Sequence, residues 1–338
     1  MNLECAIKSW LADELGCGSD MVRLVEKRDN VLSTTFLFET QGRHAKIFVK
    51  HFGEAYAGLY AKEARGVLSA NGVGEIGGVR VPKPIARNDG LRCIAIEYVK
   101  GQSLYNWMRN NIICVLFFGK SMLISNMLYD LGKWTRQCHD IGMHCGLMDG
   151  AVSDRRGIIG HYIDKASRQY EALYYNGVIN LHSANDFKSW LNRVASSLGD
   201  DEYGFCFTHG DLCLSNCMVT PDESLVVIDF ANSGLGHWLD DVMRLKIELE
   251  VCSSLIVGFG KGCARLIRSF EEGYGVSDRM QQHMHDDLLS FFLVRNILIN
   301  LSSLVSFAGK QNFVGRGDSI FLRKAYKKIM DTLLRRAL

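Results

Sequence analysis

The segment at residues 205–229 constrains the fold most, because it places short apolar strands inside a long helical stretch. A strand is predicted to end at Thr208, and a loop from His209 to Asn216 separates it from the next strand. A further apolar run follows and ends on the carboxylate of Asp229. The segment therefore excludes an all-helical fold and makes the polar loop and Asp229 candidates for chemistry.

The two parts of the chain have different patterns. Residues 22–50 contain short apolar runs between turn signals, which predicts strands, and residues 93–99 predict a buried strand. Between them, apolar positions at three- and four-residue steps predict a helix over 55–70. The later pattern is mainly helical, over residues 103–118, 121–142, 157–175, 184–198, 238–272, 279–307 and 319–336. Each of the last three ranges is expected to contain a break. The sequence therefore predicts a two-lobed α+β chain, with a small β-rich lobe and one main helix at 1–100 and a large, mostly helical lobe at 101–338.

Composition narrows the class of protein. The 338 residues are 47% hydrophobic and 22% charged with a net charge of +2, which suits a folded chain and argues against nucleic acid as the main partner. The 11 cysteines contain no Cys-x-x-Cys pair, which indicates reduced thiols rather than a disulfide framework. The N-terminal residues show no signal peptide, and the apolar run at 112–118 is far shorter than the ~20 residues that cross a bilayer. We therefore expect a cytoplasmic protein without a transmembrane span.

Three polar groups of the 205–229 segment match the needs of phosphoryl transfer to an alcohol. Such a reaction needs a carboxylate that accepts or orients the hydroxyl proton, oxygen ligands for Mg²⁺, and a cation against the phosphates that are not transferred. Asp211 can supply the carboxylate, and Asn216 and Asp229 can supply the oxygen ligands. Most of the rate in such reactions comes from positioning and charge neutralisation, so these few groups are sufficient.

A lysine near the end of a strand can supply the cation. Lys50 follows the apolar run 47–49, and Glu63 on the next predicted helix is the acid that would hold it. Lys46 is the alternative to Lys50, because strand residues an even number of positions apart face the same side. For Glu63 the alternative is a solvent-facing position on the helix.

Two of these segments carry a family resemblance. His209-Gly210-Asp211 followed by Asn216, and then Ile228-Asp229-Phe230, resemble the aminoglycoside phosphotransferase and choline kinase-like superfamily, whose members are relatives of protein kinases. The resemblance covers about residues 25–250 and implies a two-lobed protein-kinase-like fold. It implies that Asp211 is the catalytic base, that Asn216 and Asp229 hold Mg²⁺, and that Lys50 with Glu63 anchors the phosphates of ATP.

The same resemblance assigns supporting roles to other residues. Backbone groups of Glu97, Tyr98 and Val99, at the connection between the lobes, would hold the adenine. The first hairpin has no glycine, and Ser33 in that hairpin would contact the phosphates. Asp241 would brace the catalytic loop from the next helix, with Asp240 as the alternative acid. His209 is expected to act as a structural hydrogen-bonding residue rather than as a proton carrier.

We therefore expect an ATP- and Mg²⁺-dependent phosphotransferase that acts on a hydroxyl of a small molecule: a sugar, an amino alcohol, a glycan precursor or an aminoglycoside-type antibiotic. A nucleotide-binding pseudokinase or regulatory module is the alternative. A protein Ser/Thr kinase is a further alternative, which the missing Ala-Pro-Glu segment argues against. These motifs specify neither the acceptor, nor the choice between ATP and GTP, nor the oligomeric state. The basic amphipathic helix at 319–336 is expected to pack as a terminal helix, with peripheral contact to an anionic membrane as the alternative.

Overall fold

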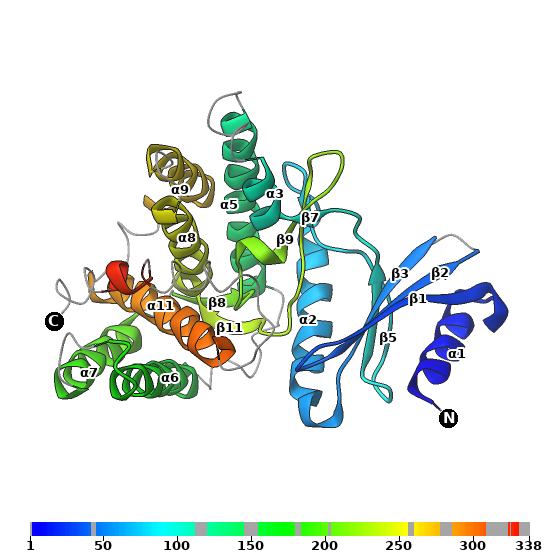
Figure 1. The fold of residues 1–338 in the computed structure, drawn as a ribbon, viewed down its shortest axis with the longest axis horizontal. Helices are drawn as coiled ribbons and strands as arrows, with labels where there is room; N and C mark the ends of the chain where they lie inside the picture. Colours follow the sequence, from blue (N-terminus) through cyan, green and yellow to red (C-terminus); the bar gives the residue numbers. More distant parts are fainter. Residues whose placement is uncertain are drawn as a thin grey trace. The chain divides into compact units, whose positions relative to one another are not determined.

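The computed structural model describes residues 2–41, 45–111, 120–144, 155–179, 184–201, 204–255, 260–277, 286–308, 324 and 326–330. The chain forms two compact units, each of which makes most of its residue contacts within itself (Figure 1). Unit 1 contains Met1–Asn110, His209–Asp211 and Ser215–Gly234, and unit 2 contains Asn111–Thr208, Leu212–Leu214 and Leu235–Leu338. The polar loop and the strands after it thus pack largely with the N-terminal residues. The predicted division into lobes at residue 100 is a division along the sequence and stays a prediction.

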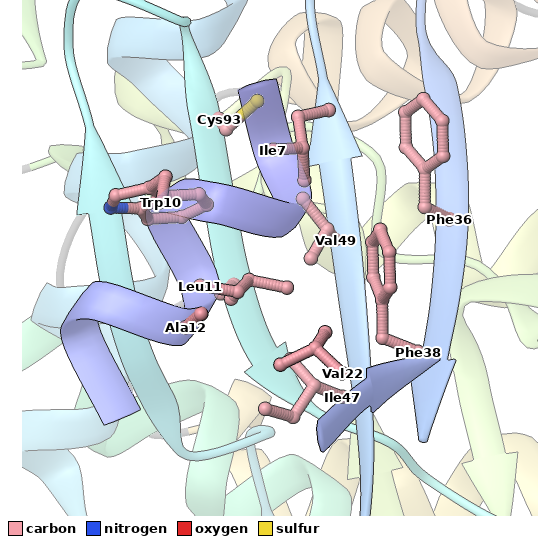
Figure 2. Packing of buried hydrophobic residues seen from close by; sticks show 11 residues of the cluster. Ile7, Trp10, Leu11, Ala12, Val22, Phe36, Phe38, Ile47, Val49 and Cys93 are labelled. Carbon is pink, nitrogen blue, oxygen red and sulfur yellow. The ribbon is translucent and has the colours of Figure 1, made fainter. Parts of the chain in front are cut away.

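Unit 1 is built on a five-stranded sheet in the order β1-β2-β3-β6-β5, in which neighbouring strands are antiparallel. The strands are β1 (Val22–Asp29), β2 (Thr34–Thr40), β3 (Lys46–His51), β5 (Pro84–Asn88) and β6 (Cys93–Glu97). Helix α1 (Leu3–Leu15) covers one face through Ile7, Trp10 and Leu11 (Figure 2). Phe38 and Val49 lie under it, because alternate residues of β2 and β3 point to this face. Lys50 consequently points to the opposite face.

The rest of unit 1 contains helix α2 and a second sheet. Helix α2 (Ala57–Val73) follows a short 3₁₀ turn, η2 (Glu54–Tyr56). The second sheet has four short strands in the order β4-β10-β9-β7, which are β4 (Val79–Arg80), β7 (Gln102–Ser103), β9 (Cys217–Val219) and β10 (Leu225–Val227). Helix α3 (Leu104–Asn110) packs on β7 and β9, and the 3₁₀ turn η4 (Leu214–Asn216) precedes β9. This sheet joins the chain after Asn216 to the end of the N-terminal part.

Unit 2 is mainly helical. Its described helices are α5 (Lys120–His144), α6 (Arg155–Tyr175), α7 (Ala184–Asp200), α8 (Trp238–Leu255), α9 (Gly260–Tyr274) and α11 (Asp286–Ala308). Strand β8 (Phe205–Thr208) pairs with β11 (Gly234–His237). Helix α5 lies along α9, and α11 packs on α6, α7 and α8 (Figure 1). The helical pattern predicted for this part of the chain is confirmed in the described residues, and the break expected within 238–272 separates α8 from α9.

One stretch of the described residues, Asp287–Val305 in α11, is long and apolar enough to cross a membrane by length and composition alone. About half of it, 56%, is buried inside the protein. It carries the buried Arg295, which is paired with Asp240 of α8, and Trp190 Nε1 donates to Asp287 Oδ1 at 3.3 Å. These contacts are those of a core helix.

The predicted basic C-terminal helix lies mostly outside the described residues. In its described part, Tyr326 and Met330 are buried, and Asn300 Nδ2 of α11 donates to the Tyr326 hydroxyl at 3.0 Å. This part of the helix therefore packs on unit 2, as expected for a terminal helix with one solvated face.

Candidate active site

Lys50 lies between two carboxylates of unit 1. Its Nζ is 3.0 Å from Oε2 of Glu63 on α2 and 2.6 Å from Oδ1 of Asp229, which follows β10. The side chain of Glu63 is almost fully buried, whereas 45% of the Asp229 side chain is exposed. Lys46, four residues earlier on β3, lies 3.4 Å from Glu39 instead. The structure thus brings Lys50, and not Lys46, to the two predicted acids, and it excludes a solvent-facing position for Glu63.

The charges of this group depend on one another. Burial would lower the pKa of the Lys50 ammonium, but Glu63 and Asp229 outweigh it and raise that pKa above the ordinary lysine value. Burial would raise the pKa of Asp229, but Lys50 outweighs it and lowers that pKa. For Glu63 burial outweighs Lys50, so its pKa is raised. Lys50 and Asp229 are therefore charged at neutral pH, and Lys50 is the main group that opposes protonation of Glu63.

Asp229 holds an unusual backbone conformation. Its φ is +68°, in the left-handed region that few residues other than glycine, asparagine and aspartate adopt. The next two backbone amides make hydrogen bonds in this conformation: Phe230 N–H donates to the Glu63 carboxylate, and Ala231 N–H donates to the carboxylate of Asp229. Because Glu63 receives both Lys50 and Phe230 N–H, it ties β3 to the backbone that carries Asp229.

His209 holds the start of the polar loop with both ring nitrogens. Nε2 donates to the carbonyl oxygen of Ile228 at 3.1 Å, and Nδ1 accepts the N–H of Asp211 at 3.3 Å. A carbonyl can only accept and an amide N–H can only donate, so the ring is the neutral Nε2–H tautomer. These two bonds support the predicted structural role of His209, which stays a prediction.

Asn216 is bonded to Asp211. Its Nδ2 donates to the Asp211 carbonyl oxygen at 3.0 Å and to Oδ2 of the Asp211 carboxylate at 3.3 Å. Both partners are acceptors, so the amide nitrogen must face Asp211 and the amide oxygen Oδ1 faces away. The carbonyl of Asn216 accepts the N–H of Ile228 at 2.9 Å, which fixes the loop to the strand before Asp229. The structure thus links the three predicted catalytic residues through backbone and side-chain bonds within unit 1.

The predicted adenine-binding segment follows β6. Glu97 N–H donates to the Lys83 carbonyl at 3.0 Å, and Tyr98 N–H donates to the Lys46 carbonyl at 3.4 Å. The Glu97 carboxylate is paired with Arg80. Val99 N–H has no hydrogen-bond partner in the part of the chain that the structure describes. Of the three predicted residues, Val99 therefore offers the N–H that a ligand could use.

Ser33 lies in the turn between β1 and β2. Its carbonyl oxygen accepts the N–H of Asn30 at 2.9 Å, and Thr34 Oγ1 next to it donates to Asp29 Oδ1 at 2.9 Å. These bonds close the hairpin without a glycine. Contact of Ser33 with phosphates stays a prediction.

The predicted brace, Asp241, lies in unit 2. It is buried, with Oδ2 at 3.1 Å from Nε2 of His139 on α5, and His139 Nδ1 is 2.8 Å from the Tyr274 hydroxyl of α9. The alternative acid, Asp240, is paired with Arg295 of α11. Contact of Asp241 with the catalytic loop stays a prediction.

Glu248, one of the acidic residues that could face a cationic acceptor, makes a loop contact within unit 2 that the sequence did not predict. Glu248 Oε2 of α8 accepts the N–H of Leu214 at 2.8 Å. Glu248 lies two helical turns after Asp241 on the same face of α8, and this spacing was the available signal. This bond fixes the backbone at Leu214 within unit 2.

Comparison with known proteins gives a consistent result. A family model described as "Phosphotransferase enzyme family" matches residues 28–281. None of the curated proteins matches. A choline kinase from Cryptosporidium parvum Iowa II is 12% identical, with a TM-score of 0.55 over 98% of this chain and 96% of that chain. Aminoglycoside phosphotransferase APH(4)-Ia is 12% identical, with a TM-score of 0.56 over 98% of both chains. An ethanolamine kinase from Plasmodium vivax is 12% identical, with a TM-score of 0.53 over 95% of this chain and 85% of that chain.

At such identities the likeness to solved structures shows the fold. The α+β fold with a β-rich N-terminal part and a mostly helical remainder is that of these kinases, as the sequence predicted.

Proposed function

The chain belongs to the phosphotransferase enzyme family, and from this premise we propose that it transfers the γ-phosphate of ATP to a hydroxyl group of a small molecule. The observation that carries the proposal is the position of Lys50 between Glu63 and Asp229, in the same unit as the bonded pair Asp211 and Asn216. This set contains each group that phosphoryl transfer to an alcohol needs: a cation, metal ligands and a base.

Lys50 would anchor the phosphates that are not transferred. Its pKa is raised by Glu63 and Asp229 against the effect of burial, so it is a cation at any physiological pH. Glu63, fixed by Phe230 N–H, holds the ammonium in place before nucleotide arrives. A cation held by the protein costs little reorganisation when the phosphates bind.

Asn216 and Asp229 fit a Mg²⁺ ion. The amide orientation of Asn216 leaves Oδ1 facing away from Asp211, and Asp229 is an exposed carboxylate with a lowered pKa. Among the described residues no cluster of three or more His, Cys, Asp and Glu could form a metal cage. Mg²⁺ typically takes one or two carboxylates and completes its shell with phosphate oxygens and water, so two protein ligands are sufficient. When bound, the ion would neutralise charge on the phosphates.

Asp211 would act as the base. Its carboxylate is oriented by Nδ2 of Asn216, and its backbone N–H is held by His209. A carboxylate fixed in this way can align the acceptor hydroxyl for attack and take its proton as the new P–O bond forms. The bond between the γ-phosphorus and the bridging oxygen breaks, and ADP leaves.

The acceptor belongs to the class of small alcohols. The similar proteins of known fold include kinases named for choline and ethanolamine and phosphotransferases named for aminoglycosides, which supports an amino alcohol or an aminoglycoside-type antibiotic. A sugar or a glycan precursor is proposed from the sequence motifs alone. We also propose that the protein works in the cytoplasm. All nine described cysteines are free thiols, as a reducing compartment would keep them.

A screen for ADP release tests the proposal. Purified protein is incubated with Mg²⁺ and ATP, or with Mg²⁺ and GTP, against amino alcohols, aminoglycosides and sugars. We expect one of these acceptor classes to raise ADP release above the acceptor-free rate, with label from γ-labelled ATP in the small-molecule fraction. Nucleotide binding without acceptor-dependent release would favour a regulatory module, and label in the protein fraction would favour a protein kinase.

A further inference from the structure

The turn that follows Asp229 lies in close contact with two other segments of unit 1. Ser233 N–H donates to the Phe230 carbonyl at 2.9 Å and closes the turn at residues 230–233. On α2, a methyl group added at Gly66 would overlap Ser233 Oγ and would lie 2.6 Å from Phe230 Cβ. At the polar loop, a methyl group added at Gly210 would overlap the carbonyl oxygen of Asn232. The turn therefore fits only because glycine stands at both contact points.

A polar bond adds to the contact with α2. The buried Ser233 hydroxyl donates to the carbonyl oxygen of Lys62 at 3.1 Å. In an α-helix this carbonyl also accepts the N–H of Gly66, four residues later. The close approach at Gly66 and the hydrogen bond of the Ser233 hydroxyl thus join the turn to the same helical turn of α2, which runs from Lys62 to Gly66. This helical turn contains Glu63, which accepts Lys50 Nζ and Phe230 N–H.

We propose that Gly66 and Ser233 are positioning residues of the phosphotransfer site, which set how closely Glu63 approaches Asp229. The inference rests on the proposed function, because it assigns these residues to the Lys50–Glu63–Asp229 group. Its physical basis is that Glu63 lies on α2, whereas Asp229 lies directly before the turn at residues 230–233. The flexible Lys50 side chain cannot fix the distance between these two segments. A long lysine side chain can follow either carboxylate, whereas the missing side chain of Gly66 allows the turn to approach α2 closely and the 3.1 Å bond of Ser233 holds it there.

The cost of glycine inside α2 supports a specific role for Gly66. An interior glycine destabilises a helix by roughly 0.5–1 kcal/mol relative to alanine. Gly58 of the same helix has no atom within 4 Å of an added methyl group, so it makes no comparable contact. Gly58→Ala and Gly66→Ala are therefore a matched pair: the same change in the same helix, with and without the contact to the turn.

The test compares these two variants by their kinetics and by nucleotide binding. For Gly66→Ala we expect kcat/KM for MgATP to fall at least tenfold and the Mg²⁺ concentration for half-maximal ATP binding to rise severalfold. Both are measured at least 15 °C below the Tm of each variant. Gly58→Ala should stay within twofold of the wild type in both measurements and should have an equal or higher Tm.

Ser233→Ala provides the second variant in case Gly66→Ala does not fold. It removes the bond to Lys62 without adding bulk, and we expect a rise in the Mg²⁺ requirement in the same direction. Ser69→Ala is its control, because the Ser69 hydroxyl donates only within α2, to the Arg65 carbonyl at 2.8 Å. A lower Tm with unchanged kcat/KM and an unchanged Mg²⁺ titration in both Gly66→Ala and Ser233→Ala would overturn the inference, since the two residues would then only pack.

The Mg²⁺ titration of ATP binding needs no acceptor. Absence of turnover in the wild-type protein would thus count against the proposed function alone, and the titration would still decide the role of Gly66 and Ser233.

Discussion

Replacing Lys50 by methionine should expose how strongly the site depends on one charge. The change leaves Glu63, whose side chain is only 3% exposed, without its cation. Removing one partner of a buried ion pair costs about 3–5 kcal/mol, because the remaining charge is desolvated and unpaired. Asp229 contributes little to this loss of stability, since nearly half of its side chain is exposed to solvent. We expect Lys50→Met to lower the free energy of unfolding by about 3 kcal/mol at pH 8, the lower end of this range.

The sign of the pH dependence follows from Glu63. Burial raises its pKa, and Lys50 opposes this effect in the wild type. In Lys50→Met the folded-state pKa of Glu63 therefore rises further above its unfolded value of about 4.3. A carboxyl with a raised folded-state pKa binds more protons when folded, so stability is lost as pH rises from the unfolded pKa through the folded one. The penalty should be smaller at pH 5 than at pH 8.

The assay is urea unfolding followed by tryptophan fluorescence and circular dichroism at both pH values. The double variant Lys50→Met/Glu63→Gln should regain most of the lost stability at pH 8, because no buried charge remains and the introduced amide oxygen would still accept Phe230 N–H. Lys46→Met is the matched control on the same strand; its pair with Glu39 is exposed, so it should cost no more than about 1 kcal/mol. Wild-type stability of Lys50→Met at pH 8, or a double variant no more stable than the single one, would refute the reasoning.

Two further predictions concern the metal and the thiols. Asp229→Asn should make ATP affinity nearly the same with Mg²⁺ and with EDTA, as measured by calorimetry; a wild-type Mg²⁺ titration would count against its role as a ligand. At pH 8 iodoacetamide should label the exposed Cys5 and leave Cys93 unmodified, since burial raises the pKa of the Cys93 thiol to about 12 against the opposing charge of Arg92. Mass spectrometry of the native protein measures both, and equal labelling would contradict the buried position of Cys93.

Local spacing made one part of the site predictable. Asp211 and Asn216 belong to one loop, and Asp229 ends the second apolar strand after that loop, so the three residues lie on successive short segments. Their catalytic and metal-binding roles come from the family resemblance and stay predictions. The choice of Lys50 over Lys46 required the structure. Strand alternation places Lys46 and Lys50 on one face, and only the position of α2 decides which of them meets Glu63.

Contacts between distant segments were beyond the sequence. Ser233 and Lys62 are bonded across a long stretch of chain, and no periodicity connects them. Gly66 gave a weak signal, because glycine inside a helical pattern usually has a packing reason. Glu248 resembled any other acidic residue of a helix until its bond to Leu214 was seen. The packing of the chain after Ser215 with the N-terminal unit likewise depends on the pairing of β7 with β9 and of β4 with β10.

Single-turnover phosphate transfer by Asp211→Ala tests the central claim most directly. The measurement uses γ-labelled ATP and the acceptor identified by the ADP-release screen, and nucleotide affinity is determined in parallel. Removal of the base should slow transfer at least about 100-fold and leave the Kd for MgATP within about threefold of the wild type, because Asp211 acts on the hydroxyl and not on the nucleotide. Transfer within tenfold of the wild-type rate, or a loss explained entirely by weaker ATP binding, would contradict the assignment.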